Sequence, residues 1–144
     1  MKTHKITTII GWALFLAVLS VYMFTLEPVA SFWDSGEYIA SSYKLEIPHP
    51  PGGPLFLLLG RLFSFFAFGD KQQVAWAINS LSAVSSALAI MFLFWTIVRI
   101  SAKVIDKANA HFDLLTWCAG IVGALSFAFT DTFWVSATET ELYG

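Results

Sequence analysis

A long stretch of apolar residues without charge near the start of the chain most constrains how it can fold. The stretch covers residues 6–24 and contains no Asp, Glu, Lys or Arg. As a helix it is about 29 Å long, enough to cross a hydrocarbon core of roughly 30 Å. Lys2 and Lys5 precede it, as in a signal peptide, but the apolar region of a signal peptide is usually about 7–15 residues long. We therefore expect an uncleaved membrane anchor.

Two further segments are apolar enough to span a membrane. The second covers residues 74–100, and small polar residues in its first half indicate contacts with other helices. The third covers residues 114–133, where Gly120, Gly123 and Ala124 form a small-residue face suited to helix packing. Only 12% of the chain is charged, against roughly 25% in soluble domains. The predicted fold class is an all-α membrane protein with about three transmembrane helices.

A fourth apolar run, residues 55–68, is too short for a span and carries Arg61 near its middle. An arginine inside hydrocarbon costs at least about 2.5 kcal/mol. We therefore expect residues 27–72 to form an outer loop with interfacial or re-entrant helices. The buried face of the run would be formed by Leu55, Leu58, Leu59, Leu62 and Phe66.

Basic residues indicate the orientation of three such spans. One side would hold Lys2, Lys5, Arg99, Lys103 and Lys107, and the other only Lys44, Arg61 and Lys71. This bias places the N-terminus in the cytoplasm and the 27–72 loop on the outer face. Most of the acids fall on the outer side, so we expect the acidic loop to meet the end of the third span there.

Two acids and a proline-rich run stand out in the outer loop. Asp34 and Glu37 are three residues apart, so on a helix they share one face. Acid/base chemistry at a membrane surface is one interpretation, and a capping-box-like pattern in which Asp34 caps a helix is the other. The same pattern recurs at residues 138–141, which include Glu139 and Glu141. His49 lies between two prolines that hold it extended.

Composition and spacing exclude other kinds of site. A net charge of −2 gives no electrostatic footprint for a nucleic-acid partner. Cys118 is the only cysteine, so neither a disulfide framework nor a cysteine-based metal site can form. The spacing of the histidines and acids matches no strong metal-ligand motif, so no metal or other cofactor is predicted, although a divalent metal is not excluded.

One combination of motifs resembles a known family. It consists of Trp33-Asp34-Ser35-Gly36-Glu37-Tyr38-Ile39-Ala40, then Lys44-Leu45, then His49-Pro50-Pro51-Gly52 with Pro54-Leu55-Phe56. These motifs are similar to those of bacterial multi-pass membrane proteins of a domain of unknown function, related to transmembrane protein O-mannosyltransferases. More distantly, the layout is similar to GT-C glycosyltransferases. The resemblance covers about residues 6–144, and because family proteins are much longer, the chain looks like an N-terminal fragment that is inactive alone.

The resemblance implies sugar transfer, with mannose as a candidate, from a lipid-phosphate donor to a protein or glycan hydroxyl on the outer face. The expected location is a bacterial inner membrane, with membrane lipid as a further partner. Asp34 would be the base that takes the acceptor's proton, and Glu37 would orient the acceptor or share the charge. The other substrate-binding candidates are His49 and Arg61, at the donor phosphate, and Glu139 and Glu141.

Two other classes of protein stay open. A membrane transporter would also place acids and broken helices near the membrane centre, but here the polar residues crowd one span and the acids lie at its ends. A non-catalytic membrane scaffold would need no acid pair, so neutral substitutions at Asp34 and Glu37 would have no effect.

Overall fold

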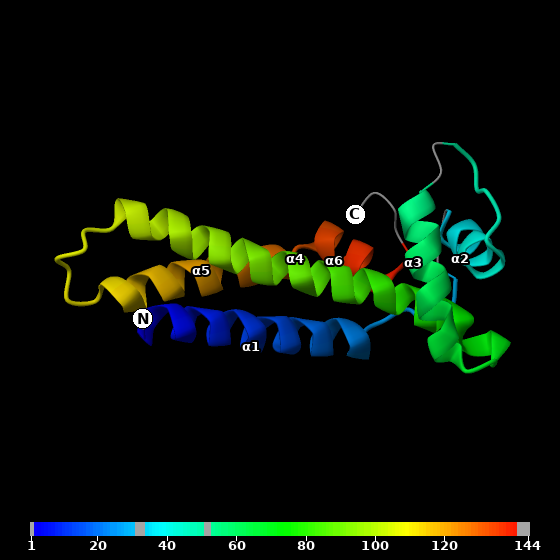
Figure 1. The fold of residues 1–144 in the computed structure, drawn as a ribbon, viewed down its shortest axis with the longest axis horizontal. Helices are drawn as coiled ribbons and strands as arrows, with labels where there is room; N and C mark the ends of the chain where they lie inside the picture. The colour runs from blue at the N-terminus through cyan, green and yellow to red at the C-terminus, as the bar shows by residue number, and fades with distance from the viewer. Residues whose placement is uncertain (1, 31–33, 51–52, 141–144) are drawn as a thin grey trace.

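The protein, seen in a computed structural model that describes residues 2–30, 34–50 and 53–140, is a set of helices joined by short loops (Figure 1). The predicted all-α fold is confirmed, because no strand occurs in these described residues. Two helical segments, His4–Phe24 and Lys71–Val104, are long and apolar enough to cross a membrane, and a bent pair of helices would make a third span. The elements are α1 (Lys2–Phe24), α2 (Ser35–Lys44), α3 (Pro54–Ser64), the 3-10 turns η1 (Phe65–Ala67) and η2 (Lys71–Gln73), α4 (Val74–Val104), α5 (Phe112–Ala128) and α6 (Asp131–Thr138).

Three long helices, α1, α4 and α5, lie side by side along the length of the molecule (Figure 1). Helix α4 runs opposite to the other two, so the N-terminus and the α4–α5 loop share one end. The apolar interior forms mainly where α4 meets α1 and α5, and Ile90 and Phe94 of α4 are completely buried in it. The other buried members of this core are Val18, Tyr22, Leu26, Ala83, Ala87, Val98, Ala124, Ala128 and Ala137.

The small-residue face of α5 packs directly against α4, as predicted. A Cβ atom on Gly120 would lie 2.6 Å from Cγ2 of Val98 and 2.8 Å from Cδ2 of Phe94. These separations are too short for real carbon atoms, so a side chain here would push the two helices apart. Ala124, one turn further along, is completely buried. The close approach of α5 to α4 therefore depends on the absence of a side chain at position 120.

The predicted third span is broken into two helices. Helix α5 ends at Ala128, α6 begins at Asp131, and the two axes are bent by 69°. Thr130 leaves the helical conformation, with φ −73° and ψ 143°, and Thr and Asp residues favour the start of a new helix at such a point. The buried hydroxyl of Tyr22 donates to the Ala128 carbonyl at 2.8 Å, pairing a group at the end of α5. The sequence prediction of one segment over 114–133 missed this break.

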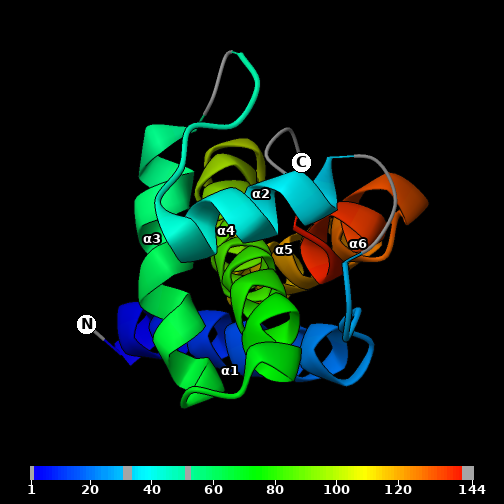
Figure 2. The same cartoon turned by 90° about the vertical axis from the view of Figure 1, so that its right-hand side faces the viewer.

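The two short helices of the first loop lie at the opposite end of the molecule from the N-terminus. Helices α2 and α3 run across the direction of α4 rather than along it (Figures 1 and 2). The loop therefore contains short helices, as predicted, and their place at a membrane interface stays a prediction. Helix α3 contacts the protein through Leu57, Gly60 and Ser64, so the predicted buried face does not pack against the described part of the chain. The side chains predicted to be buried are exposed: Leu55, Leu58, Leu59, Leu62 and Phe66.

Candidate active site in the first loop

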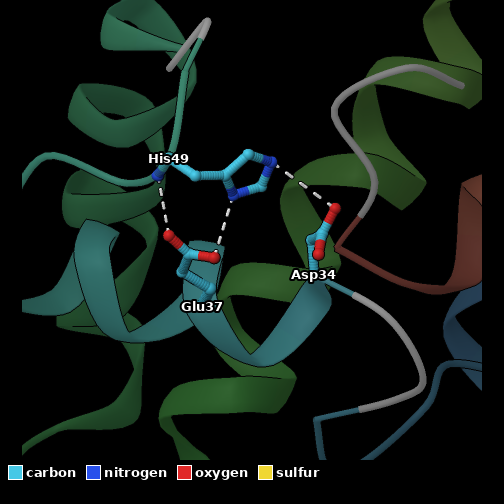
Figure 3. A group of neighbouring side chains, drawn as sticks. All are labelled: Asp34, Glu37 and His49. Atoms are coloured by element: carbon cyan, nitrogen blue, oxygen red, sulfur yellow. Dashed lines mark hydrogen bonds and ion pairs between the residues drawn. The ribbon is translucent and has the colours of Figure 1, made fainter.

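Asp34 stands at the start of α2 but does not use its carboxylate to cap the helix. Its backbone carbonyl accepts the N–H of Tyr38 at 3.0 Å, which opens the helix. Its side chain makes no capping hydrogen bond. The side-chain oxygen Oδ2 instead lies 3.6 Å from Nε2 of His49 (Figure 3). Of the two interpretations of the Asp34–Glu37 spacing, the geometry therefore favours the one in which the carboxylate is available for chemistry.

Glu37 holds His49 with both of its carboxylate oxygens. The His49 backbone N–H donates to Oε1 at 2.7 Å, and the ring atom Nδ1 lies 2.9 Å from Oε2. The neighbouring prolines Pro48 and Pro50 restrict the backbone on each side of the histidine. Figure 3 shows the result: the imidazole lies between the two carboxylates, one ring nitrogen toward each. Glu37 thus fixes both the position and the orientation of the His49 ring.

These contacts shift two pKa values in opposite directions. The hydrogen bond from the His49 backbone, followed by that from its ring, lowers the pKa of the Glu37 carboxyl. The hydrogen bond to Glu37 raises the pKa of the His49 imidazole, and the charges of Glu37 and Asp34 act in the same direction. The protonated ring is therefore favoured, with one N–H directed at Glu37 and the other toward Asp34. All three side chains are exposed, so solvent screens these interactions.

The ring of Tyr38 lies against the His49 ring of the acid–histidine cluster, which consists of Asp34, Glu37 and His49. The tyrosine is buried, and its ring centroid lies 5.8 Å from that of His49 and 6.0 Å from that of Phe56 in α3. The ring contacts connect the proline-rich segment to both short helices. Sequence reasoning placed Tyr38 in the helix after Asp34 but gave it no role, because nothing in its spacing indicates a contact with His49.

A buried amide on α4 holds the loop that leads into α2. Asn79 is completely buried, and its Nδ2 donates to the carbonyls of Glu27 at 2.7 Å and Val29 at 3.3 Å. Its Oδ1 accepts from the hydroxyl of Thr140. The Glu27 N–H also donates to the Thr138 carbonyl at 3.1 Å. The acidic loop and the end of the third apolar segment therefore meet, as predicted, and Asn79 joins them. The sequence identified Asn79 only as a polar residue within a span.

Two further predicted site residues that the structure describes, Arg61 and Glu139, do not join the cluster. Arg61 donates from Nη1 to the Tyr43 carbonyl at 2.6 Å, and its guanidinium lies over the rings of Tyr43 and Phe65 at 5.2 and 5.1 Å. It connects the end of α2 to α3, which is a structural role. Glu139 follows α6 directly and makes no contact with the cluster in the described structure. Glu141 lies outside the described residues.

The cluster also has the composition of a metal-ligand set that sequence spacing did not reveal. Asp34, Glu37 and His49 each offer one ligand atom, and these atoms lie within 4.8 Å of one another. However, both oxygens of Glu37 already contact His49, and both ring nitrogens face a carboxylate. The arrangement as it stands is an ion-paired histidine between two acids.

The fold and the cluster define a helical membrane protein that carries an acid–histidine cluster on the loop after its first span. The chain belongs to the family described as the protein O-mannosyl-transferase TMEM260 N-terminal domain, which it matches over residues 34–144. It is 30% identical to protein O-mannosyl-transferase tmem260 of Dictyostelium discoideum over 130 residues, 90% of this chain and 14% of that protein. It is 36% identical to protein O-mannosyl-transferase TMEM260 of Mus musculus over 110 residues, 73% of this chain and 15% of that protein.

The chain thus spans about one seventh of the length of these relatives. No solved structure matches it. The matched region begins at Asp34 and includes the whole acid–histidine cluster, so the cluster lies in the part of the chain that defines the family.

Proposed function

We propose that this chain forms the acid-bearing N-terminal part of a membrane glycosyltransferase that moves a sugar, with mannose the first candidate, from a lipid-phosphate donor to a protein hydroxyl. The names of the relatives support mannosyl transfer to protein. Helices long enough to cross a membrane support a donor that is itself anchored in lipid. The single observation that carries the proposal is the carboxylate of Asp34, which is exposed and is not used to cap α2.

The proposed chemistry needs one proton acceptor close to the acceptor hydroxyl. As the hydroxyl oxygen bonds to the sugar's anomeric carbon, the bond from that carbon to the phosphate oxygen breaks and the lipid phosphate leaves. The hydroxyl proton passes to Asp34. Positioning of the acceptor beside the carboxylate would provide much of the rate, because an aspartate is a weak base.

Glu37 and His49 have a different task in this proposal from the one that the family resemblance implied. Because both oxygens of Glu37 bind His49, Glu37 acts as a positioning residue and does not orient the acceptor. The His49 ring faces Asp34 through Nε2 at 3.6 Å, so a protonated ring attracts the carboxylate. Arg61 is committed to Tyr43 and Phe65, so a direct contact with the donor phosphate is not assigned to it.

We further propose that the N-terminus is cytoplasmic and that the acid–histidine cluster faces the outer side. The excess of lysine and arginine near the N-terminal end of the bundle supports this orientation. The lipid phosphate of the donor would then lie at the level of α2 and α3. These two helices run across the direction of α4, which suits an interface between lipid and water.

Asp34→Asn in the full-length protein tests the catalytic assignment. Asn keeps the size of the side chain and caps a helix about as well as Asp, but it cannot take a proton. We expect the transfer rate to fall roughly 10²- to 10⁴-fold at matched protein level. Glu46→Gln is the matched control, because Glu46 is an exposed acid in the same loop whose partner at 3.8 Å is Lys44. An Asp34→Asn enzyme as active as the Glu46→Gln enzyme would refute the assignment.

A further inference from the structure

A cavity of about 380 Å³ lies at the end of the molecule opposite the acid–histidine cluster. It is bounded by the first turns of α1, including His4 and Thr8, and by the last turns of α4, including Trp95, Arg99 and Ala102. Figure 1 shows that this end carries the N-terminus and the α4–α5 loop. Nothing in the proposed sugar transfer uses it.

Hydrogen bonds from two tryptophans to Thr7 fix the helices around the cavity. The indole N–H of Trp95 donates to the Thr7 carbonyl at 3.3 Å, and that of Trp117 donates to the Thr7 hydroxyl at 3.0 Å. Gly11 lets the Trp95 ring lie directly against α1, because a Cβ at position 11 would overlap the indole. Beyond this contact the α4 side of the cavity carries the small residue Ala102, which leaves the space open. The cavity thus results from specific contacts between α1, α4 and α5.

The residues that line the cavity include a positive charge but no negative charge. Arg99 is exposed and lines the cavity, and it has no ion pair with an acid within residues 2–30, 34–50 and 53–140. None of the lining residues is acidic, and Thr8 and His4 add polar groups beside apolar Trp95. An arginine at the end of a span often simply extends into the head-group layer. Here it lines a partly open cavity beside the indole of Trp95, which an interfacial arginine does not require.

We propose that this cavity binds an anionic phospholipid from the leaflet on the N-terminal side. The guanidinium of Arg99 would bind the phosphate, for which its planar set of donors is well suited. The glycerol and first acyl carbons would lie against Trp95 and fill the space beside Ala102. Because the lipid would contact both α1 and α4, its binding would stabilise their packing.

The test uses the purified full-length protein in neutral detergent, with four versions compared. They are wild type, Arg99→Gln, Ala102→Leu, which fills the cavity without changing charge, and Lys107→Gln as the matched control. Lys107 carries the same charge at the same end but does not line the cavity. The midpoint of thermal unfolding is followed during titration with phosphatidylglycerol, phosphatidylcholine or inorganic phosphate, and retained lipid is counted by native mass spectrometry.

We expect phosphatidylglycerol, but neither phosphatidylcholine nor inorganic phosphate, to raise the unfolding midpoint of wild type and Lys107→Gln. The half-saturating concentration should rise at least about tenfold in Arg99→Gln and Ala102→Leu, with loss of the retained lipid. Equal losses in Arg99→Gln and Lys107→Gln would show diffuse charge attraction and overturn the site. An unchanged response in Ala102→Leu would show that the cavity is not occupied. Stabilisation by inorganic phosphate alone would overturn the lipid assignment. The lipid assignment would also be overturned if no lipid changed the unfolding midpoint of the wild type. That result is expected if another part of the full-length protein covers the cavity.

Discussion

Substitution of Asn79 by Leu should release the loop that carries the acid–histidine cluster. Leu has the same number of side-chain heavy atoms as Asn, branched in the same way, but no polar atoms, so three hydrogen bonds are lost. Those bonds join α4 to the carbonyls of Glu27 and Val29 and to the hydroxyl of Thr140. Because the cluster begins only a few residues after Val29, its position depends on this anchor.

The size of the effect follows from which groups lose their partners. Val29 is exposed, so its carbonyl can bind water when Asn79 is replaced. The Thr140 hydroxyl belongs to a buried residue, and the contact of Asn79 with the Glu27 carbonyl is partly buried. Each buried polar group left without a partner costs about 1–3 kcal/mol. The partly buried Glu27 carbonyl should contribute about 1 kcal/mol and the Thr140 hydroxyl about 1–3 kcal/mol. We therefore expect a loss of about 2–4 kcal/mol, which increases opening of the loop roughly 30- to 700-fold.

Hydrogen exchange in the full-length protein measures this opening directly. The Glu27 amide donates to the Thr138 carbonyl, so its exchange reports on whether the loop and α6 stay together. Ser80→Ala is the control: Ser80 is the buried neighbour of Asn79, but its hydroxyl bonds only to Ala77 within the same helix. Exchange of the segment around Glu27 that is no faster in Asn79→Leu than in Ser80→Ala would refute the reasoning.

Two further predictions concern the titration of the cluster and the orientation of the chain. Glu37→Gln should lower the pKa of His49 toward about 6.5, because the hydrogen bond that raises it is weakened, and imidazole carbon shifts in NMR titrations would show this change while the other histidines stay unaltered. In wild type, the raised pKa of His49 stabilises the fold fully below about pH 6.5, and this contribution is lost as the pH rises through the raised pKa. The lowered pKa of Glu37 acts in the opposite direction: its contribution to stability is lost as the pH falls through that pKa. For the orientation, single cysteines replacing the exposed residues Lys44 and Ala108 in a cysteine-free protein should react differently with an impermeant thiol reagent on intact cells. Labelling at position 44 alone is expected, and labelling at 108 alone would reverse the proposed orientation.

The large features of the fold follow from the sequence because the membrane limits the choices. A long segment without charges has to be a helix, so the first two spans were found from composition alone. Small residues on one side of a helix indicate close packing, and Gly120 does pack against α4. The break at Thr130 was missed because apolar residues continue on both sides of it, and hydropathy does not register a change of direction.

Side-chain partners were harder to predict because they join segments with different conformations. A three-residue spacing places Asp34 and Glu37 near each other, but His49 reaches them through an irregular segment whose path no periodicity describes. The apolar face predicted for residues 55–68 is exposed from the protein, and its burial in lipid stays a prediction. Amphipathicity alone does not tell whether an apolar face meets protein or lipid, and in α3 that face has little contact with the protein.

The two acids of the first loop are equivalent in a sequence pattern but not in the structure. Glu37 has no free oxygen, because one binds the backbone of His49 and the other binds its ring. Within the described residues, Asp34 has one ion-pair partner, His49 at 3.6 Å, and no capping bond. A base must have a lone pair directed at the substrate, and the Asp34 carboxylate, which accepts no hydrogen bond in the part of the chain that the structure describes, is less engaged than that of Glu37. His49, restricted by Pro48 and Pro50 and hydrogen-bonded to Glu37, turns its second ring nitrogen toward Asp34 at 3.6 Å.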